Sequence, residues 1–227
     1  MCPSNSFGLD RVLFPDCRAG PFCDLPQTVG HLQIDAGAGA DTVDASALPD
    51  LGLSILIEGG DCANTIDASA LPDLGLNVLL EGGNQNDTIT GSAGPSAING
   101  NMGNDSLIGG AAADTIMGGG GDDIMNSGAG GDMLTGQAGD DTMTGDTGDD
   151  TINGGADTDL IVETRDANFD LGDASLTISP TETDTLMDVE EADLTGGASA
   201  NTIDASDFSG VATLTGNDGD DTMTGAQ

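Results

Sequence analysis

The chain has 227 residues, with 37 Gly, 40 Asp or Glu and 3 Lys or Arg, and its formal net charge is −37. Trp and Tyr are absent and only 5 Phe occur, so a core of large side chains is not expected. Nucleic acids and anionic membranes are excluded as partners because no basic face can form. No apolar run approaches the ~20 residues of a membrane span, and divalent cations are the expected partners of so acidic a surface.

Residues 1–31 contain no repeat, and we expect them to form a small cap over the repeats that follow. Cys2, Cys17 and Cys23 lie in this segment, and Cys62 lies beyond it. The even number of cysteines predicts a disulfide cap, with one bond inside residues 1–31 and one to Cys62. Intermolecular disulfides and free thiols are the alternatives. A zinc site is not expected, because the cysteine spacing is irregular and the chain has a single His.

Residues 32–81 contain a long repeat, which starts at Ala36 and again at Gly59. The segment DASALPDLGL occurs twice, at 44–53 and 67–76. We interpret each long unit as one coil in which a longer loop replaces a second glycine-rich turn. In this interpretation Asp41 and Asn64 occupy equivalent positions in successive turns. The loops act as spacers or as a contact surface.

Residues 82–162 divide into nine consecutive nonapeptides without an insertion. They read GGNQNDTIT, GSAGPSAIN, GNMGNDSLI, GGAAADTIM, GGGGDDIMN, SGAGGDMLT, GQAGDDTMT, GDTGDDTIN and GGADTDLIV. The first six residues of each unit predict a turn, in which glycines supply positive φ. The last three predict a short strand, whose middle residue is always Ile, Leu or Met and points inward.

Two nonapeptides make one coil, so every second turn stacks on the same edge. One edge is predicted to stack Asp87, Asp105, Asp123, Asp141 and Asp159, and the other Ser96, Asp114, Asp132 and Asp150. Coils lie roughly 4.8 Å apart, so these carboxylates would repel one another without a cation between them. Ca²⁺ accepts about 6–8 oxygen ligands from carboxylates and carbonyls. A disordered Gly/Asp segment and a metal-free solenoid are the alternatives.

The repeat G-G-x-G-x-D-x-U-x resembles the calcium-binding nonapeptide of RTX proteins, the hemolysin-type repeats of bacterial secreted proteins. The resemblance covers most of residues 36–227. It implies an all-β fold, a right-handed parallel β-roll or β-solenoid with calcium-binding turns. It also implies location outside the cell.

Residues 163–227 depart from the strict repeat. The alternating segments between 163 and 195 predict one or two coils without well-formed sites. GGASANTID and GNDGDDTMT then restore the motif with Asn201 and Asp221. About ten coils, stacked over roughly 45–50 Å, are expected in all.

The predicted metal ligands share the sixth position of a glycine-rich turn, and together they predict roughly eight to ten Ca²⁺ ions. They are Asp41, Asn64, Asp87, Asp105, Asp114, Asp123, Asp132, Asp141, Asp150, Asp159 and Asp221.

No enzyme activity is expected, because no Ser-His-Asp or Cys-His arrangement is available and the carboxylates belong to the turns. The sequence favours an extracellular calcium-binding structural or adhesive element that folds on Ca²⁺, with end-to-end self-association into filaments as an extension. A calcium-triggered folding module that assists secretion of a larger protein is the alternative. Ice binding by outward Thr rows is a lesser one, because Ile124 and Leu160 interrupt the row.

Overall fold

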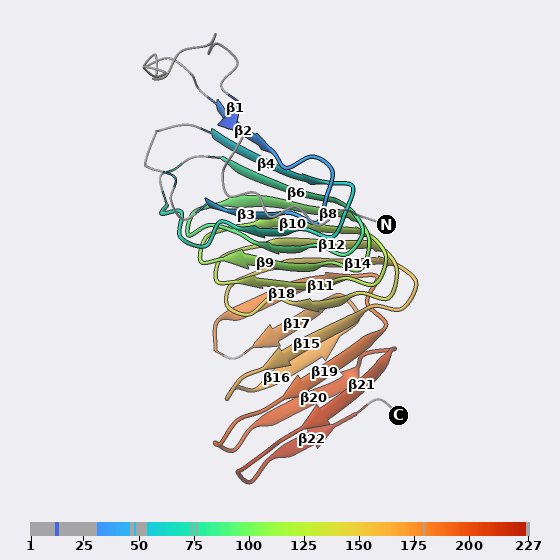
Figure 1. Cartoon of the computed structure of the whole chain (residues 1–227). Coiled ribbons are helices and arrows are strands. Elements are labelled where there is room, and N and C mark those ends of the chain that lie inside the picture. Colours follow the sequence, from blue (N-terminus) through green and yellow to red (C-terminus); the bar gives the residue numbers. More distant parts are fainter. Residues whose placement is uncertain are drawn as a thin grey trace.

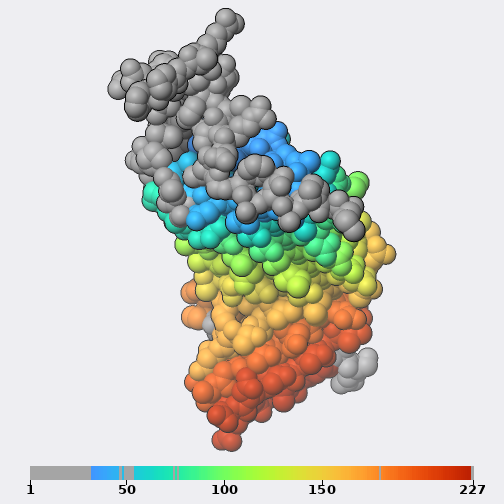
Figure 2. Space-filling model, viewed as in Figure 1, coloured from blue at the N-terminus to red at the C-terminus, as the bar shows by residue number. Residues whose placement is uncertain are grey.

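The computed structural model describes residues 12–13, 31–45, 48, 54–73, 75, 77–178 and 180–225. These residues form 22 β-strands, and no helix occurs among them. The strands stack as successive coils from one end of the molecule to the other (Figure 1). The surface accordingly shows bands of colour that follow the sequence from blue to red (Figure 2).

The strands form two sheets. The larger sheet contains β1 (Val12–Leu13), β2 (His31–Asp35), β4 (Ser54–Gly60), β6 (Val78–Asn84), β8 (Ser96–Met102), β10 (Thr115–Gly120), β12 (Met133–Ala138), β14 (Thr151–Ala156), β16 (Phe169–Gly172), β17 (Ser175–Ile178), β18 (Glu182–Met187), β20 (Thr202–Asp207) and β22 (Thr222–Thr224). The smaller sheet contains β3 (Thr42–Asp44), β5 (Thr65–Asp67), β7 (Thr88–Thr90), β9 (Ser106–Gly110), β11 (Ile124–Gly128), β13 (Thr142–Thr144), β15 (Leu160–Thr164), β19 (Glu191–Thr195) and β21 (Val211–Thr215).

Neighbouring strands within the repeats pair in parallel and in strict register. Ile116 pairs with Ile98 on one side and with Leu134 on the other, and each partner lies two nonapeptides away along the chain. From β2 to β15 the chain alternates between the two sheets, so the larger sheet receives the even-numbered strands and the smaller sheet the odd-numbered ones. The predicted parallel β-solenoid is therefore confirmed. Each coil adds one strand to the nine-stranded sheet, so the described residues form about nine coils rather than the expected ten.

The core lies between the two sheets, and in the nonapeptide region each strand contributes one large apolar side chain to it. The middle residue of each nonapeptide strand is at most 1% exposed. Each such burial contributes roughly 1.5–3 kcal/mol. The nine residues are Ile89, Ile98, Leu107, Ile116, Met125, Leu134, Met143, Ile152 and Ile161.

The segment after β15 contains one further coil, within the expected one or two, and also a hairpin that the sequence did not predict. Strands β18 and β19 do continue the coils, pairing in parallel with β14 and β15 respectively. Between β15 and β18, however, β16 and β17 form an antiparallel hairpin, and β17 is also antiparallel to β18. The larger sheet thus gains two strands that the smaller sheet lacks, because β15, β19 and β21 pair directly.

At the N-terminal end of the stack, β1 pairs antiparallel with β2 and covers one edge of the larger sheet. Cys62 is 4% exposed in the turn after β4, whereas Cys2, Cys17 and Cys23 lie outside the described residues. The disulfide cap therefore stays a prediction. No helix with the length and apolar character needed to cross a bilayer is found in the described part of the chain.

Candidate metal sites along the two edges

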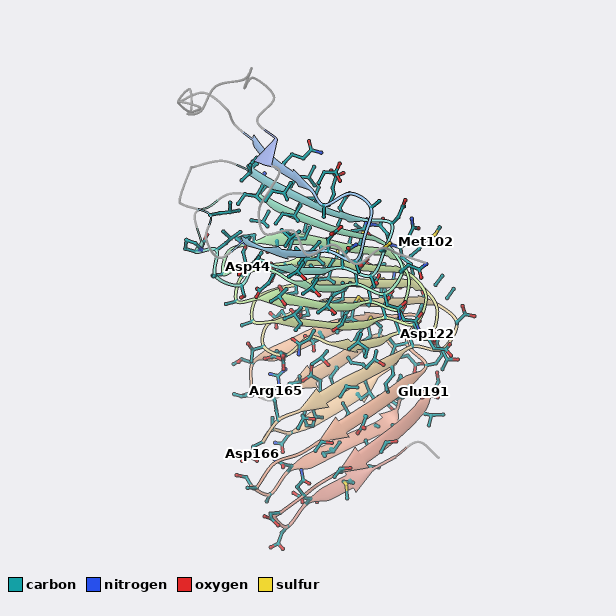
Figure 3. All side chains as sticks on the ribbon, viewed as in Figure 1. Asp44, Met102, Asp122, Arg165, Asp166 and Glu191 are labelled. Atoms are coloured by element: carbon teal, nitrogen blue, oxygen red, sulfur yellow. The ribbon has the colours of Figure 1, made fainter. Side chains whose placement is uncertain are left out.

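The turns of the solenoid place two rows of buried polar side chains along its edges. We call the turns that lead from the larger to the smaller sheet the first edge, and those that lead back the second edge. Figure 3 shows the two edges on opposite sides, with Asp122 and Glu191 on the first and Arg165 and Asp166 on the second. The first row contains Asp41, Asn64, Asp87, Asp105, Asp123, Asp141 and Asp159, each at most 3% exposed. The second contains Ser96, Asp114, Asp132, Asp150 and Asp184, each at most 4% exposed.

Each row carboxylate after Asp41 is oriented by a main-chain hydrogen bond from the preceding coil. On the first edge the amide of Asp87 donates to Oδ1 of Asp105 at 2.7 Å, and the amide of Asp123 donates to Oδ1 of Asp141 at 2.8 Å. On the second edge the amide of Asp114 donates to Oδ1 of Asp132 at 2.7 Å. One oxygen of each row carboxylate except that of Asp41, which begins the first row, is therefore satisfied by the protein.

The other oxygen of each carboxylate is buried and has no hydrogen-bond partner. The ten aspartates with such an Oδ2 atom are Asp41, Asp87, Asp105, Asp114, Asp123, Asp132, Asp141, Asp150, Asp159 and Asp184, and at Asp41 Oδ1 is unpartnered as well. An ionised carboxylate that is buried without a partner costs several kcal/mol. Repeated coil after coil, this cost favours either a bound cation or protonation of the carboxylates.

Glycines in the turns let main-chain oxygens of neighbouring coils come close to these carboxylates. A Cβ atom on Gly109 would lie 2.7 Å from Oδ2 of Asp114, and one on Gly145 would lie 2.6 Å from Oδ2 of Asp150. At the fourth turn position, a Cβ on Gly139 would collide with the carbonyl oxygen of Gly121 in the coil before. The turns thus offer carboxylate and carbonyl oxygens together, which is the donor set of Ca²⁺.

No group of three or more His, Cys, Asp or Glu side chains that could hold a metal is found among the described residues. A site in these turns would therefore take few carboxylates and several carbonyls. Zinc prefers nitrogen and sulfur ligands, whereas calcium accepts an oxygen shell of this kind. The residues present fit calcium.

The electrostatics of the rows point in the same direction. Burial, with a smaller contribution from neighbouring carboxylates, raises the pKa of Asp87 and of Asp123 to about 7. Burial likewise raises the pKa of Asp114 and of Asp141 to about 6, with a contribution from the next aspartate in each row. Without a cation, these groups lose much of their tendency to ionise at neutral pH.

Two turns satisfy their polar groups without a metal. Oδ1 of Asn64 accepts the amide of Asp41 at 2.9 Å, so its Nδ2 must take the place that Oδ2 has in the other turns. That Nδ2 atom donates to the carbonyl of Cys62. In the turn of Ser96, its hydroxyl accepts the amide of Ser92 at 3.0 Å. Asn64 was predicted as a neutral ligand, and here it forms its own closed set of hydrogen bonds.

The rows continue further than the nonapeptides. Oε2 of Glu190 accepts the amide of Asp159 at 3.1 Å, so Glu190 ends the first row, and its longer side chain compensates for a shorter turn. On the second edge Oδ1 of Asp184 accepts the amide of Asp150 at 3.0 Å. Neither residue was predicted, although both stand two positions before an inward residue, as the aspartate of the motif does.

Asp221 lies on the second edge, separated from Asp184 by the inserted hairpin. Its Oδ1 accepts the amide of Asn201 at 2.8 Å, the same contact that links neighbouring aspartates in the two main rows. The coil before Asn201 has Ala167 at the equivalent position, two residues before the inward Phe169. Asp221 therefore belongs to a short separate pair rather than to either main row.

Stacked parallel coils, glycine-rich turns and edge rows of half-satisfied carboxylates define a calcium-binding parallel β-solenoid. The family model of the RTX calcium-binding nonapeptide repeat (4 copies) matches residues 33–50, 79–94, 99–134, 135–162 and 213–227. The chain belongs to the RTX calcium-binding nonapeptide-repeat family. Among curated proteins, none matches the chain.

Proposed function

We propose that this protein is an extracellular structural β-roll in which Ca²⁺ ions, bound between successive turns, hold the coils together. The observation that carries the proposal is the pair of rows in which every buried aspartate has an oxygen without a partner. Calcium bound to these oxygens compensates their charge, so its binding free energy becomes folding free energy. The ligands are the aspartates of the two rows together with carbonyls of their turns.

Calcium stoichiometry tests this proposal. Equilibrium dialysis of the calcium-depleted chain against Ca²⁺ should give roughly eight to ten ions per chain, bound cooperatively because each coil supports the next. Mg²⁺ at the same concentration should not replace them, because it demands a smaller octahedral shell and holds its waters. Binding of one or two ions, or none, would contradict the proposal.

An extracellular location fits the metal, since RTX repeats are typical of secreted bacterial proteins and need more free calcium than cytosol provides. End-to-end self-association is the second part of the proposal. Head-to-tail stacking of coils from different copies would be an open-ended contact that grows a filament.

Analytical ultracentrifugation in the presence of Ca²⁺ distinguishes this structural role from the alternative. Species that grow with protein concentration would support self-association. A monomer at all concentrations would favour a calcium-triggered module that assists folding of a larger secreted protein.

The smaller sheet offers only a short row of stacked threonines for ice binding. Thr42, Thr65 and Thr88 stack directly on its outer face. Farther along the same column Ile124 and Leu160 flank Thr142 and interrupt the row. An absence of thermal hysteresis is therefore expected.

A further inference from the structure

On the second edge, the turn after Asp150 is made of two separate segments of the chain. Glu163 stands two nonapeptides after Gly145, at the first position of what would be the next unit. From there the chain leaves into β16 instead of completing the turn. The fifth and sixth positions are filled from β18, where Thr183 donates its amide to Asp149 at 2.8 Å and Asp184 accepts from Asp150.

Arg165 joins these two segments. Its guanidinium donates to both carboxylate oxygens of Glu182, at 2.6 and 2.8 Å, so the contact is bidentate. The same guanidinium donates to Oε2 of Glu163 from Nε at 3.3 Å and from Nη2 at 3.2 Å. Glu163 belongs to the outgoing segment and Glu182 to the incoming one, so one cation holds both.

The split turn carries more negative charge than the continuous turns. Glu163 is fully buried, and its other oxygen accepts the amide of Asp146 at 3.1 Å. Asp184 is also fully buried, with Oδ2 unpartnered. Glu163 and Glu182, whose side chain is 17% exposed, both pair with Arg165, and Asp184 adds a third negative charge within its electrostatic reach. Of the chain's three Lys or Arg residues, Arg165 alone lies in the described part.

We propose that Arg165 is an intrinsic counter-cation, whose guanidinium supplies at the split turn the positive charge that calcium supplies in the continuous turns. A continuous turn can gather main-chain carbonyls around an ion. The split turn instead brings two extra carboxylates together, and the planar guanidinium fits them bidentately. Arg165 therefore takes the place of calcium at Glu163 and Glu182 and fastens the inserted hairpin to the repeats. This inference rests on the proposed calcium function.

The test replaces Arg165 with Met in the full chain, which removes the charge and the donors but keeps the aliphatic stem. The uncompensated carboxylates should then recruit calcium, so Arg165→Met should bind one more Ca²⁺ per chain than the wild type in equilibrium dialysis. The calcium concentration at half-folding, followed by circular dichroism, should rise severalfold. Arg165→Lys keeps the charge and should retain the wild-type stoichiometry.

A second variant keeps the test decisive if Arg165→Met does not fold. The triple substitution Glu163→Gln, Arg165→Met and Glu182→Gln removes the charges together, and it should fold with the wild-type number of calcium ions. If Arg165→Met folds with an unchanged calcium stoichiometry and an unchanged calcium concentration at half-folding, the inference is overturned. It is also overturned if the triple variant does not fold, or if Arg165→Lys changes both quantities as much as Arg165→Met does. Wild-type protein that binds no calcium would instead refute the proposed function itself.

Discussion

The two oxygens of each row aspartate have different roles, and this division explains the motif at the scale of single residues. Oδ1 accepts a main-chain amide from the neighbouring coil, as in the 2.8 Å bond from Asp105 to Asp123. Oδ2 has no partner in the protein, and we propose that it binds the metal. Asn64 shows the alternative. Its Oδ1 still accepts a main-chain amide, that of Asp41, but its Nδ2 donates to the carbonyl of Cys62 and leaves no free oxygen for a metal.

Replacement of a row aspartate by asparagine should therefore weaken calcium binding without disrupting the ladder. In Asp123→Asn, Oδ1 can still accept the amide of Asp105, while the other atom becomes a donor that calcium cannot use. The calcium concentration at half-folding should rise roughly two- to tenfold, since one ligand among about 6–8 is lost.

Asp122 provides the matched control for this substitution. It is exposed, and both its carboxylate oxygens are hydrogen-bonded, Oδ1 to the amide of Asp140 at 3.1 Å and Oδ2 to Asn104 at 3.3 Å. Asp122→Asn should leave the calcium midpoint almost unchanged. Equal shifts for Asp122→Asn and Asp123→Asn would argue against ligation by the buried row.

The raised pKa values of the row predict the pH dependence of the calcium-free chain. Burial raises the pKa of Asp87 to about 7 and that of Asp150 to about 6, whereas unfolded carboxyls titrate near 3.9. The folded state then binds more protons than the unfolded state between these values, so acidification stabilises it. β-structure should return as the pH falls through about 7 to 5 and be lost again as the pH rises.

Circular dichroism of protein depleted of calcium by ion exchange, rather than held in a chelator whose affinity changes with pH, measures this effect. A transition centred near pH 4, where exposed carboxyls titrate, would contradict the assignment to buried groups.

At the scale of elements, the turn depends on glycines that leave no room for a side chain. Gly136 begins the turn of Asp141, and a Cβ there would meet the carboxylate of Asp141 and, at 2.5 Å, the carbonyl oxygen of Gly154. Both neighbours are held by the stack, so neither can move aside. The same crowding that excludes side chains is what brings the oxygens together.

Gly136→Ala should therefore destabilise the calcium-loaded protein by about 2 kcal/mol or more, as overpacking does in a tightly packed core. Gly131→Ala is the control, because a Cβ there would only touch the carbonyl oxygen of Asp149 at an ordinary 3.4 Å. Urea unfolding at saturating Ca²⁺ measures both, and a loss for Gly131→Ala as large as for Gly136→Ala would contradict the packing argument.

The sequence was informative wherever the repeat is strict and less so beyond it. Inward residues such as Ile116 and row residues such as Asp123 were predictable, because fixed spacing assigns each residue to a face and to an edge. The β16–β17 hairpin was not, since alternating segments such as FDLG and SLTI suit parallel and antiparallel pairing equally. Glu163 and Arg165 were missed because their contact depends on that hairpin, which splits the turn.

At the scale of the whole molecule, the fold consists of a thin core and two charged edges. In the nonapeptide coils, one large inward residue per strand buries little surface compared with a globular domain, and the chain carries a formal charge of −37. Self-repulsion on this scale opposes a compact state. Cations along both edges reverse that balance, so the stack as a whole should behave as a calcium-dependent folding unit.

Removal and return of calcium at neutral pH tests this central claim most directly. Far-ultraviolet circular dichroism should show loss of the β signal when EGTA is added and its recovery when Ca²⁺ is restored in excess, with Mg²⁺ unable to replace it. A β signal that persists in EGTA would show that the coils stack without calcium, which would contradict this account.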